Sequence, residues 1–302
     1  MTTKVVVAGG TGFLGRHISR ALLDAGLEVT VLGRDPAKVS SIPELQGANA
    51  TRGDVTDPRS LTGTLQGADA VVQVFQFPNY PMESPKKGLT FDNYERRGGE
   101  HLLAEAHRAD VSKYVFISGA GADPSSEKTW YRAKGLMERA IRSSGIDHAI
   151  IRPSWAYGPE DKALNKFRAI ARLSPVVPYP GVTPQRIQPV YVTDIAATVA
   201  RVFERDAWNE VFEIGSREIM TMTEVIEVML EVMNKKRVVI GVPVPLVKLA
   251  TSPLLMLPRP PLSPQAVEFA IQDGLVDITK AVEILGIEPL ELREGLRRYI
   301  HA

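Results

Sequence analysis

Short runs of β-branched and aliphatic residues recur through the first 150 positions, separated by helix-compatible stretches. We expect strands at Lys4 to Ala8, Glu28 to Leu32, Ala50 to Arg52, Ala70 to Phe75, Lys113 to Ser118 and His148 to Arg152. Several of these runs are apolar at nearly every position, which suits strands buried on both faces of a parallel sheet. Their alternation with helices predicts crossover connections and an α/β fold.

The stretch between the first two expected strands has helical periodicity. Leu14, Ile18, Ala21 and Leu22 fall on one stripe, and Gly26 stands where a helix commonly ends. A strand followed at once by such a helix is the opening unit of a nucleotide-binding fold. We therefore predict a doubly wound parallel sheet of the Rossmann type with a smaller C-terminal substrate-side lobe.

The composition changes after Arg152. The expected elements are Pro-rich loops from Ser174 to Pro189, a helix from Asp194 to Glu204 capped by Asp194, a strand from Val211 to Ile214, a helix opened by Thr223, and short helices near Ser263 to Gln272 and Pro289 to His301. This pattern predicts an NAD(P)-binding domain over residues 1–155, to which segment 185–215 returns. Residues 156–302 are expected to form a smaller mixed α/β lobe.

Two long Pro-containing stretches stand out from this pattern. Gln76 to Thr90 exceeds ordinary connection lengths, and either a lid over a substrate or a disordered surface loop fits it. Val238 to Leu262 is apolar but is interrupted by prolines, so it cannot form a single helix. It fits either a pocket for an apolar molecule or a docking surface.

Charge and composition narrow the classes of protein. The chain has 36 Lys and Arg against 35 Asp and Glu, and this balance argues against a nucleic-acid partner. The absence of Cys excludes thiolate catalysis and Cys-ligated metals, and the five His form no ligand pair, so we expect no metal. The chain shows no signal-peptide pattern and no apolar run long enough for a transmembrane span. We expect a cytoplasmic location, with peripheral membrane association as the alternative.

The most informative motif is the glycine-rich turn after the first strand, Gly9-Gly10-Thr11-Gly12-Phe13-Leu14-Gly15. In a dinucleotide site, Gly9 permits the tight turn, Gly12 lets the backbone approach a pyrophosphate, and Gly15 allows close helix packing. The free N–H groups of the helix that begins here, from Phe13 and Leu14 onward, favour phosphate. We therefore expect Gly9, Thr11, Gly12, Phe13, Leu14 and Gly15 to bind a nicotinamide dinucleotide.

The residues after the second and third strands bear on cofactor choice. Arg34 can stack on adenine and pair with a 2′-phosphate, and Lys38 and Arg16 add positive charge. In the alternative, Arg34 and Lys38 are solvated and Asp35 binds the ribose of NAD. We predict NADP(H) in preference to NAD(H), with Asp54 near the adenine amino group.

These motifs together resemble a known family. They are the glycine motif, Gly53-Asp54-Val55, Ser118, Lys134, Arg152 to Pro159 and Pro189 to Ala196. Over nearly its whole length the chain resembles an extended or atypical short-chain dehydrogenase/reductase. Gly12 to Arg16 and Leu262 to Glu268 are similar to the subgroup of the accessory NAD(P)H-binding subunit of mitochondrial complex I. The resemblance implies cofactor contacts at Val55 and Pro153 and a nicotinamide ribose contact at Lys134.

The resemblance also implies a catalytic Ser or Thr after the fifth strand and a Tyr four residues before the Lys, where the two share a helix face. Here Trp130 stands four residues before Lys134, and Tyr131 stands three before it. One position rotates a side chain by about 100° around a helix. Ser118 comes one or two residues too early. Ser118, Tyr131 and Lys134 are the catalytic candidates, with the first two displaced.

Two hypotheses follow for function. One is an NADPH-dependent oxidoreductase acting on an apolar, quinone-like or aromatic substrate. The other is a catalytically silent NADPH-binding subunit of a membrane-associated complex, which would explain the displaced groups directly. A third interpretation, a sugar-nucleotide epimerase or dehydratase, ranks last, because its chemistry needs the missing Tyr.

Overall fold

The computed structural model describes residues 2–78, 80–181, 185–251 and 271–300. A seven-stranded, all-parallel sheet runs in the spatial order β3-β2-β1-β4-β5-β6-β11. Its strands are β1 (Lys4–Ala8), β2 (Glu28–Gly33), β3 (Asn49–Arg52), β4 (Ala70–Gln73), β5 (Lys113–Ile117), β6 (Asp147–Pro153) and β11 (Glu210–Ile214). This order confirms the doubly wound sheet. The order reverses between β1 and β4, the point where such sheets bind dinucleotides.

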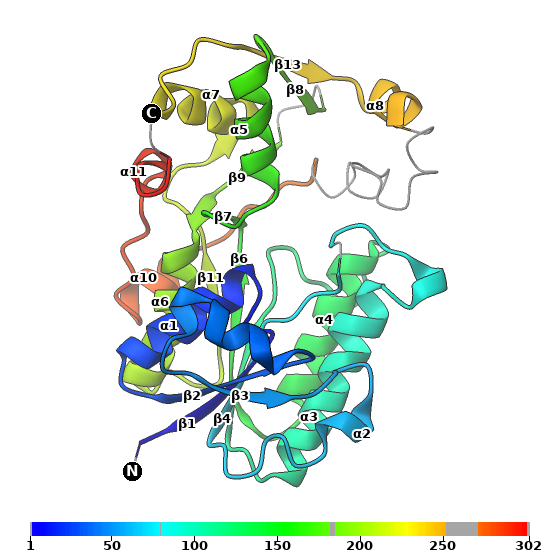
Figure 1. The fold of residues 1–302 in the computed structure, drawn as a ribbon, viewed down its shortest axis with the longest axis vertical. Helices are drawn as coiled ribbons and strands as arrows, with labels where there is room; N and C mark the ends of the chain where they lie inside the picture. Colours follow the sequence, from blue (N-terminus) through cyan, green and yellow to red (C-terminus); the bar gives the residue numbers. More distant parts are fainter. Residues whose placement is uncertain (1, 79, 182–184, 252–270, 301–302) are drawn as a thin grey trace.

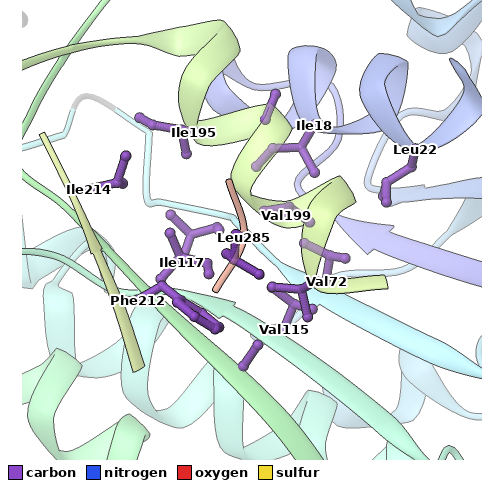
Figure 2. Packing of buried hydrophobic residues seen from close by; sticks show 14 of the residues in the cluster. Ile18, Leu22, Val72, Val115, Ile117, Ile195, Val199, Phe212, Ile214 and Leu285 are labelled. Carbon is purple, nitrogen blue, oxygen red and sulfur yellow. The ribbon is translucent and has the colours of Figure 1, made fainter. Parts of the chain in front are cut away.

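Helices cover both faces of this sheet (Figure 1). One face carries α1 (Phe13–Asp24), α6 (Val192–Arg205) and α10 (Thr279–Glu283), and the other carries α2 (Pro58–Leu61), α3 (Gly98–Arg108) and α4 (Thr129–Arg142). Figure 2 shows Ile18 and Leu22 of α1 in the same cluster as Ile195 and Val199 of α6, and all four are fully buried. The apolar stripe of α1 thus has the role that its spacing predicts.

A smaller lobe lies beyond the carboxyl ends of the sheet strands (Figure 1). Its helices are α5 (Ala163–Leu173), α7 (Met222–Val232), α8 (Val244–Thr251) and α11 (Leu292–Arg297). Its strands pair as β7 (Trp155–Tyr157) with β10 (Pro189–Tyr191), β8 (Val176–Pro180) with β13 (Val238–Val242), and β9 (Arg186–Ile187) with β12 (Met220–Thr221). The buried side chains of Tyr157, Met229 and Leu296 belong to one core of this lobe.

The structure corrects several expectations about this lobe. The Pro-rich segment Ser174 to Pro189 is not simply loop, because β8 and β9 form there and β10 begins at Pro189. Their partners lie far away in the chain, so local composition could not reveal them. Helix α7 begins earlier than expected, after Thr221, which forms a capping box with Glu224. The helix expected near Ser263 to Gln272 lies almost wholly outside the described residues.

The long stretch Gln76 to Thr90 packs onto the nucleotide-binding half rather than extending freely from it. Phe77 is buried with Phe91 and Trp130, and Tyr80 and Leu89 pack against the same cluster. This aromatic cluster covers the start of α4. In the part of the chain that the structure describes, no helix is long and apolar enough to span a bilayer.

Asp194 does not cap α6 as the sequence suggested. The helix begins at Val192, so Asp194 lies within its first turn. Its Oδ2 accepts a hydrogen bond of 2.9 Å from the backbone N–H of Leu290, tying α6 to the C-terminal segment. Burial raises the pKa of the Asp194 carboxyl to about 6.

This carboxyl predicts a pH-dependent stability. Its pKa is about 6 in the folded protein and about 3.9 when unfolded, so the contribution of this carboxyl to stability is greatest below pH 4 and is lost as pH rises through 6. The corresponding loss is about 2 to 3 kcal/mol. Asp194→Asn keeps a carbonyl acceptor for Leu290 and should remove this loss, measured as the difference in urea unfolding between pH 4.5 and 7. Parallel pH curves for the two proteins would contradict the assignment.

Candidate functional site

The glycine-rich loop between β1 and α1 has the geometry that a pyrophosphate requires. Gly9 has φ +94°, and a Cβ there would lie 2.7 Å from the backbone of Phe75. A Cβ on Gly15 would overlap the Gly9 carbonyl oxygen. A Cβ on Gly12 would meet only that same oxygen, at 3.2 Å, so the chain itself leaves the space before Gly12 open.

The start of α1 offers free donors at this loop. Gly12 is the N-cap, no side chain caps the helix, and its first turn carries no acidic residue. The first N–H groups of a helix have no partner within it, and here they face the open space before the loop. The loop therefore fits a dinucleotide phosphate on structural grounds.

Three neighbours of the loop have other partners. Phe13 and Leu14 turn their side chains to the protein interior, where they pack against the lobe core, so only their backbone faces the loop. Arg16 reaches back to the Thr11 carbonyl oxygen at 3.3 Å, and its Nη1 lies 3.7 Å from Glu160 Oε1. Arg16 is thus already paired within the structure.

The basic residues that we expect to bind the adenosine part of the cofactor follow the end of β2. Arg34 Nη1 donates a 3.4 Å hydrogen bond to the Tyr94 hydroxyl, which directs the guanidinium across the edge of the sheet. Lys38 Nζ lies 3.7 Å from Asp35 Oδ2, and both side chains are more than half exposed. An exposed ion pair of this kind contributes little to stability, so either residue can exchange its partner for a ligand.

Asp54 follows β3 and forms a compact turn. Its Oδ1 accepts hydrogen bonds from the backbone N–H and the hydroxyl of Thr56, at 2.9 and 2.7 Å. The Val55 carbonyl oxygen contacts His101 Nδ1 at 2.8 Å. Pro153 ends β6, and its carbonyl oxygen accepts from the Ala120 N–H. Asp54, Val55 and Pro153 lie at the carboxyl ends of their strands, the edge that holds the glycine loop.

Helix α4 carries the residues that match the family motif. Trp130 is buried in the aromatic cluster, with its ring centroid 6.2 Å from that of Phe91. Tyr131 is half-buried, with its ring beside Gly121 and its centroid 5.7 Å from that of Trp130, so it packs against the edge of the same cluster. Helix α4 is a continuous α-helix from Thr129 to Arg142. It contains no bulge that would bring Tyr131 to the position of Trp130.

Lys134 has a partner that the sequence analysis missed. Its Nζ lies 2.8 Å from Glu95 Oε2, and the two side chains are only 10% and 1% exposed. Its ammonium also reaches the Ile117 carbonyl oxygen at 3.4 Å. Glu95 Oε1 has no hydrogen-bond partner among the described residues. The ammonium at the expected ribose position is therefore held by a buried carboxylate.

Glu95 lies in a π-helical segment, η4 (Asp92–Arg97), that leads into α3. Such segments are rare and are frequently found at functional sites. Burial raises the pKa of the Glu95 carboxyl, the Lys134 ammonium lowers it, and the charge of Glu83 raises it further. Phe91, Glu95 and Leu102 are spaced as residues on one buried face of a helix. This spacing is the feature of the sequence that could have indicated that Glu95 is buried.

Ser118 belongs to a different network. Its hydroxyl donates a 2.6 Å hydrogen bond to Glu138 Oε1, and Arg152 binds the same carboxylate through Nε and Nη2 at 2.9 and 2.7 Å. Such a paired, buried arrangement stabilises the junction of α4 and β6. The Ser118 hydroxyl is therefore hydrogen-bonded to Glu138, although the Lys134 ammonium lies close by at the Ile117 carbonyl oxygen.

One further group gathers at the outer side of α1. Ligand atoms of His17, Glu44 and Glu160 lie within 4.8 Å of one another, and His17 Nε2 is 2.9 Å from Glu160 Oε2. These residues are too far apart in the chain for a spacing argument. Arg16 beside Glu160 opposes a cation there, and the expectation of no metal stays a prediction.

The loop, the strand order and the open helix terminus define a nicotinamide-dinucleotide-binding Rossmann protein. The chain belongs to the NAD(P)H-binding family, whose model matches residues 9–205, and it is an atypical short-chain dehydrogenase/reductase. A second model, for an RmlD substrate binding domain, matches residues 116–300.

Relatives span both functional hypotheses. A ceramide reductase of Caulobacter vibrioides is 30% identical over 246 residues, covering 80% of this chain and 74% of the relative. A mitochondrial NADH dehydrogenase (ubiquinone) 1 alpha subcomplex subunit 9 of Arabidopsis thaliana is 26% identical over 270 residues. That match covers 86% of this chain and 66% of the plant protein. The complex I resemblance is therefore confirmed.

Solved structures share the fold. The NADPH-dependent quinone oxidoreductase QOR2 of Escherichia coli, determined with NADPH, has a TM-score of 0.75 and 20% identity, covering 97% of this chain and 99% of its own. The UDP-glucose 4-epimerase of Thermotoga maritima has a TM-score of 0.74 and 22% identity, covering 98% of each chain. At these identities the likeness shows the fold alone.

Proposed function

We propose that this protein is an NADPH-dependent reductase acting on an apolar, quinone-like or aromatic molecule. The observation that carries the proposal is the buried Lys134–Glu95 pair, whose chain neighbours Ala133 and Tyr94 belong to the aromatic cluster. Burying two charges costs several kcal/mol each unless they compensate one another closely. A titratable pair at the expected ribose position, next to aromatic rings, suits proton handling near an apolar substrate.

The cofactor fits the chain as follows. The backbone of Gly9, Thr11, Gly12, Phe13, Leu14 and Gly15 holds the pyrophosphate. Asp54 and Val55 face the adenine, Pro153 lines the nicotinamide side, and Lys134 binds the nicotinamide ribose. When bound, the cofactor supplies the hydride. Glu95 keeps the Lys134 ammonium in place and excludes water from its buried side.

Proton delivery does not rest on Ser118 in this proposal, because its hydroxyl is committed to Glu138. Tyr131 is a weak candidate, since burial raises the pKa of its hydroxyl and its ring lies beside Gly121. The proton for the reacting oxygen comes instead from water or from the Lys134–Glu95 pair.

The test is consumption of NADPH in the presence of a panel of quinones and aromatic ketones, preceded by binding titrations with NADPH and NADH. Turnover with any acceptor, abolished by loss of the dinucleotide site, supports the reductase. Tight NADPH binding without oxidation by any acceptor favours the second function.

That second function is a catalytically silent NADPH-binding subunit of a membrane-associated complex. Trp130 at the position of the family tyrosine favours it, because the displacement of the acid then needs no replacement. The similarity to subunits of complex I in plants and in Neurospora crassa supports it. In either case we propose a cytoplasmic or membrane-peripheral location, and domain limits of 1–155 with 185–215, and 156–302.

For cofactor choice we propose NADP(H) over NAD(H), with Arg34 on the 2′-phosphate and Lys38 and Arg16 adding positive charge nearby. NADPH should bind at least about tenfold more tightly than NADH, since an Arg–phosphate hydrogen bond contributes about 1.5 to 3 kcal/mol. Arg34→Asp should invert this preference, and Lys38→Asp, a charge change at an exposed neighbouring site, should alter it less. Fluorescence titration with both cofactors measures the ratio of the two affinities. Equal affinities in the unmodified protein would contradict the proposal and would indicate that Asp35 binds the ribose.

A further inference from the structure

The free end of the smaller lobe exposes large apolar side chains. Leu173 at the end of α5 is 92% exposed, and Val238 and Ile240 of β13 are 60% and 45% exposed. Val239 and Val177 lie on the inner side of the β8–β13 pair, in the lobe core. Side chains alternate along a strand, so Val238 and Ile240 share the outer side.

These side chains belong to one continuous surface. The Val238 N–H donates to the Pro175 carbonyl oxygen at 2.9 Å, and Arg237 Nε donates to the Ala171 carbonyl oxygen at 2.9 Å. The end of α5 is thereby fastened to the start of β13, with both at the same end of the molecule (Figure 1). We call Leu173, Lys235, Lys236, Val238 and Ile240 the β13 face.

Helix α8 follows β13 and adds further exposed apolar groups. Leu246 is 55% exposed and Leu249 is 71% exposed. Large exposed side chains that cluster in this way mark an interaction surface more often than isolated ones do.

The segments that form the β13 face carry charge of one sign. Segments 162–193 and 232–251 contain no Asp or Glu, although the whole chain is nearly neutral. Lys235 and Lys236 are exposed immediately before Val238. On α5, exposed Lys162 and Lys166 share a helix face with Leu173.

Three acidic residues of α7 lie in a separate depression. Glu224, Glu227 and Glu231 lie on α7 and line a separate depression with Ile219 and Met220. Among the described residues of these segments, the charged side chains of the β13 face are therefore basic.

We propose that the β13 face docks this protein on the surface of an anionic lipid bilayer. Exposed apolar side chains flanked by lysines match the two layers of such a surface, since the lysines meet anionic headgroups and the apolar groups enter the boundary of the acyl region. A protein partner would need complementary carboxylates and a shaped pocket for Leu173, whereas a bilayer accommodates scattered apolar groups. The proposal is independent of whether the protein turns over a substrate.

The test is co-sedimentation of the full chain with vesicles of phosphatidylcholine, with and without phosphatidylglycerol. We expect at least about tenfold tighter binding to the anionic vesicles, weakened as salt increases. Lys235→Glu/Lys236→Glu should remove this preference. Val238→Ser/Ile240→Ser should weaken binding to anionic vesicles while retaining its salt dependence.

Matched controls keep the test specific. Lys86→Glu/Lys87→Glu makes the same charge change at two exposed lysines outside the β13 face, and Ile284→Ser removes an apolar side chain that is 42% exposed elsewhere. Both should bind like the unmodified protein, and NADPH should still raise the melting temperature of every variant. Equal binding to neutral and anionic vesicles, or equal losses in the controls, would overturn the proposal. A further test uses natural membranes that have first been treated with protease. If the treatment abolishes binding, the proposal is overturned in favour of a protein partner.

Discussion

Replacing Gly12 by valine is expected to abolish NADPH binding while the protein stays folded. Gly12 has φ −76° and ψ 178°, which a β-branched residue adopts readily. A Cβ there meets only the Gly9 carbonyl oxygen at 3.2 Å, a tight contact that a shift of a few tenths of an ångström in the loop relieves. The valine methyl groups instead fill the space before the N-terminus of α1, where the pyrophosphate must lie. The measurement is the rise in melting temperature on addition of NADPH, which should disappear.

Two comparisons separate loss of binding from loss of folding. Gly15→Val should destabilise the protein even without cofactor, because its Cβ would overlap the Gly9 carbonyl oxygen. Ala25→Val makes a similar change at the exposed C-cap of the same helix and should keep the NADPH-dependent rise. If the rise persists in Gly12→Val, the phosphates bind elsewhere.

Removal of the Lys134 side chain should have the largest effect on any turnover, whereas Tyr131→Phe should change it by less than about tenfold. A positioned acid contributes about a hundredfold or more, but only when its hydroxyl reaches the reacting oxygen. Tyr131 lies beside Gly121 on a regular helix, one position after Trp130, which occupies the place of the family tyrosine. Lys134→Ala removes the expected ribose contact and should lower NADPH affinity as well as turnover. Steady-state kinetics and NADPH titration of both variants provide the measurement.

The ion pair requires a specific control for this comparison. Lys134→Ala leaves Glu95 buried without its partner, a change that costs about 3 to 5 kcal/mol in other proteins. The double variant Lys134→Met/Glu95→Gln removes both charges and should recover much of the thermal stability without recovering NADPH affinity. If Tyr131→Phe lost more than a hundredfold in turnover at unchanged NADPH affinity, Tyr131 would be the acid and our account of Trp130 would be wrong. If the double variant bound NADPH as tightly as the unmodified protein, Lys134 would not be the residue that contacts the nicotinamide ribose.

Much of the nucleotide-binding half could be predicted from the sequence because its signals are local. Strand β1 is a run of valines, α1 shows its buried stripe through Leu14, Ile18 and Leu22, and the glycine loop lies between them. Each of these features depends on residues close together in the chain. The phosphate-binding role that we expect for the loop rests on a backbone conformation at Gly9 that favours glycine.

The smaller lobe could not be predicted in the same way. The strand β8 contains Pro178 and Pro180 and forms because β13, about sixty residues later, supplies its hydrogen bonds. Local propensity is weak evidence for a strand of this kind, since pairing and burial determine it. Asp194 illustrates the same limit, because its partner is the distant Leu290 N–H rather than its own helix.

By itself the sequence determined the doubly wound sheet, the glycine loop and the displacement of Tyr131 from the family position, since periodicity, glycine spacing and residue offset are all written along the chain. Only the tertiary structure decided the partners of the charged groups. It placed Glu95 against Lys134, Glu138 against Ser118 and Glu160 against His17, pairs that join different elements. The physical reason is that a buried charge is stabilised by whatever group packing brings within a few ångströms, and packing is a property of the whole fold.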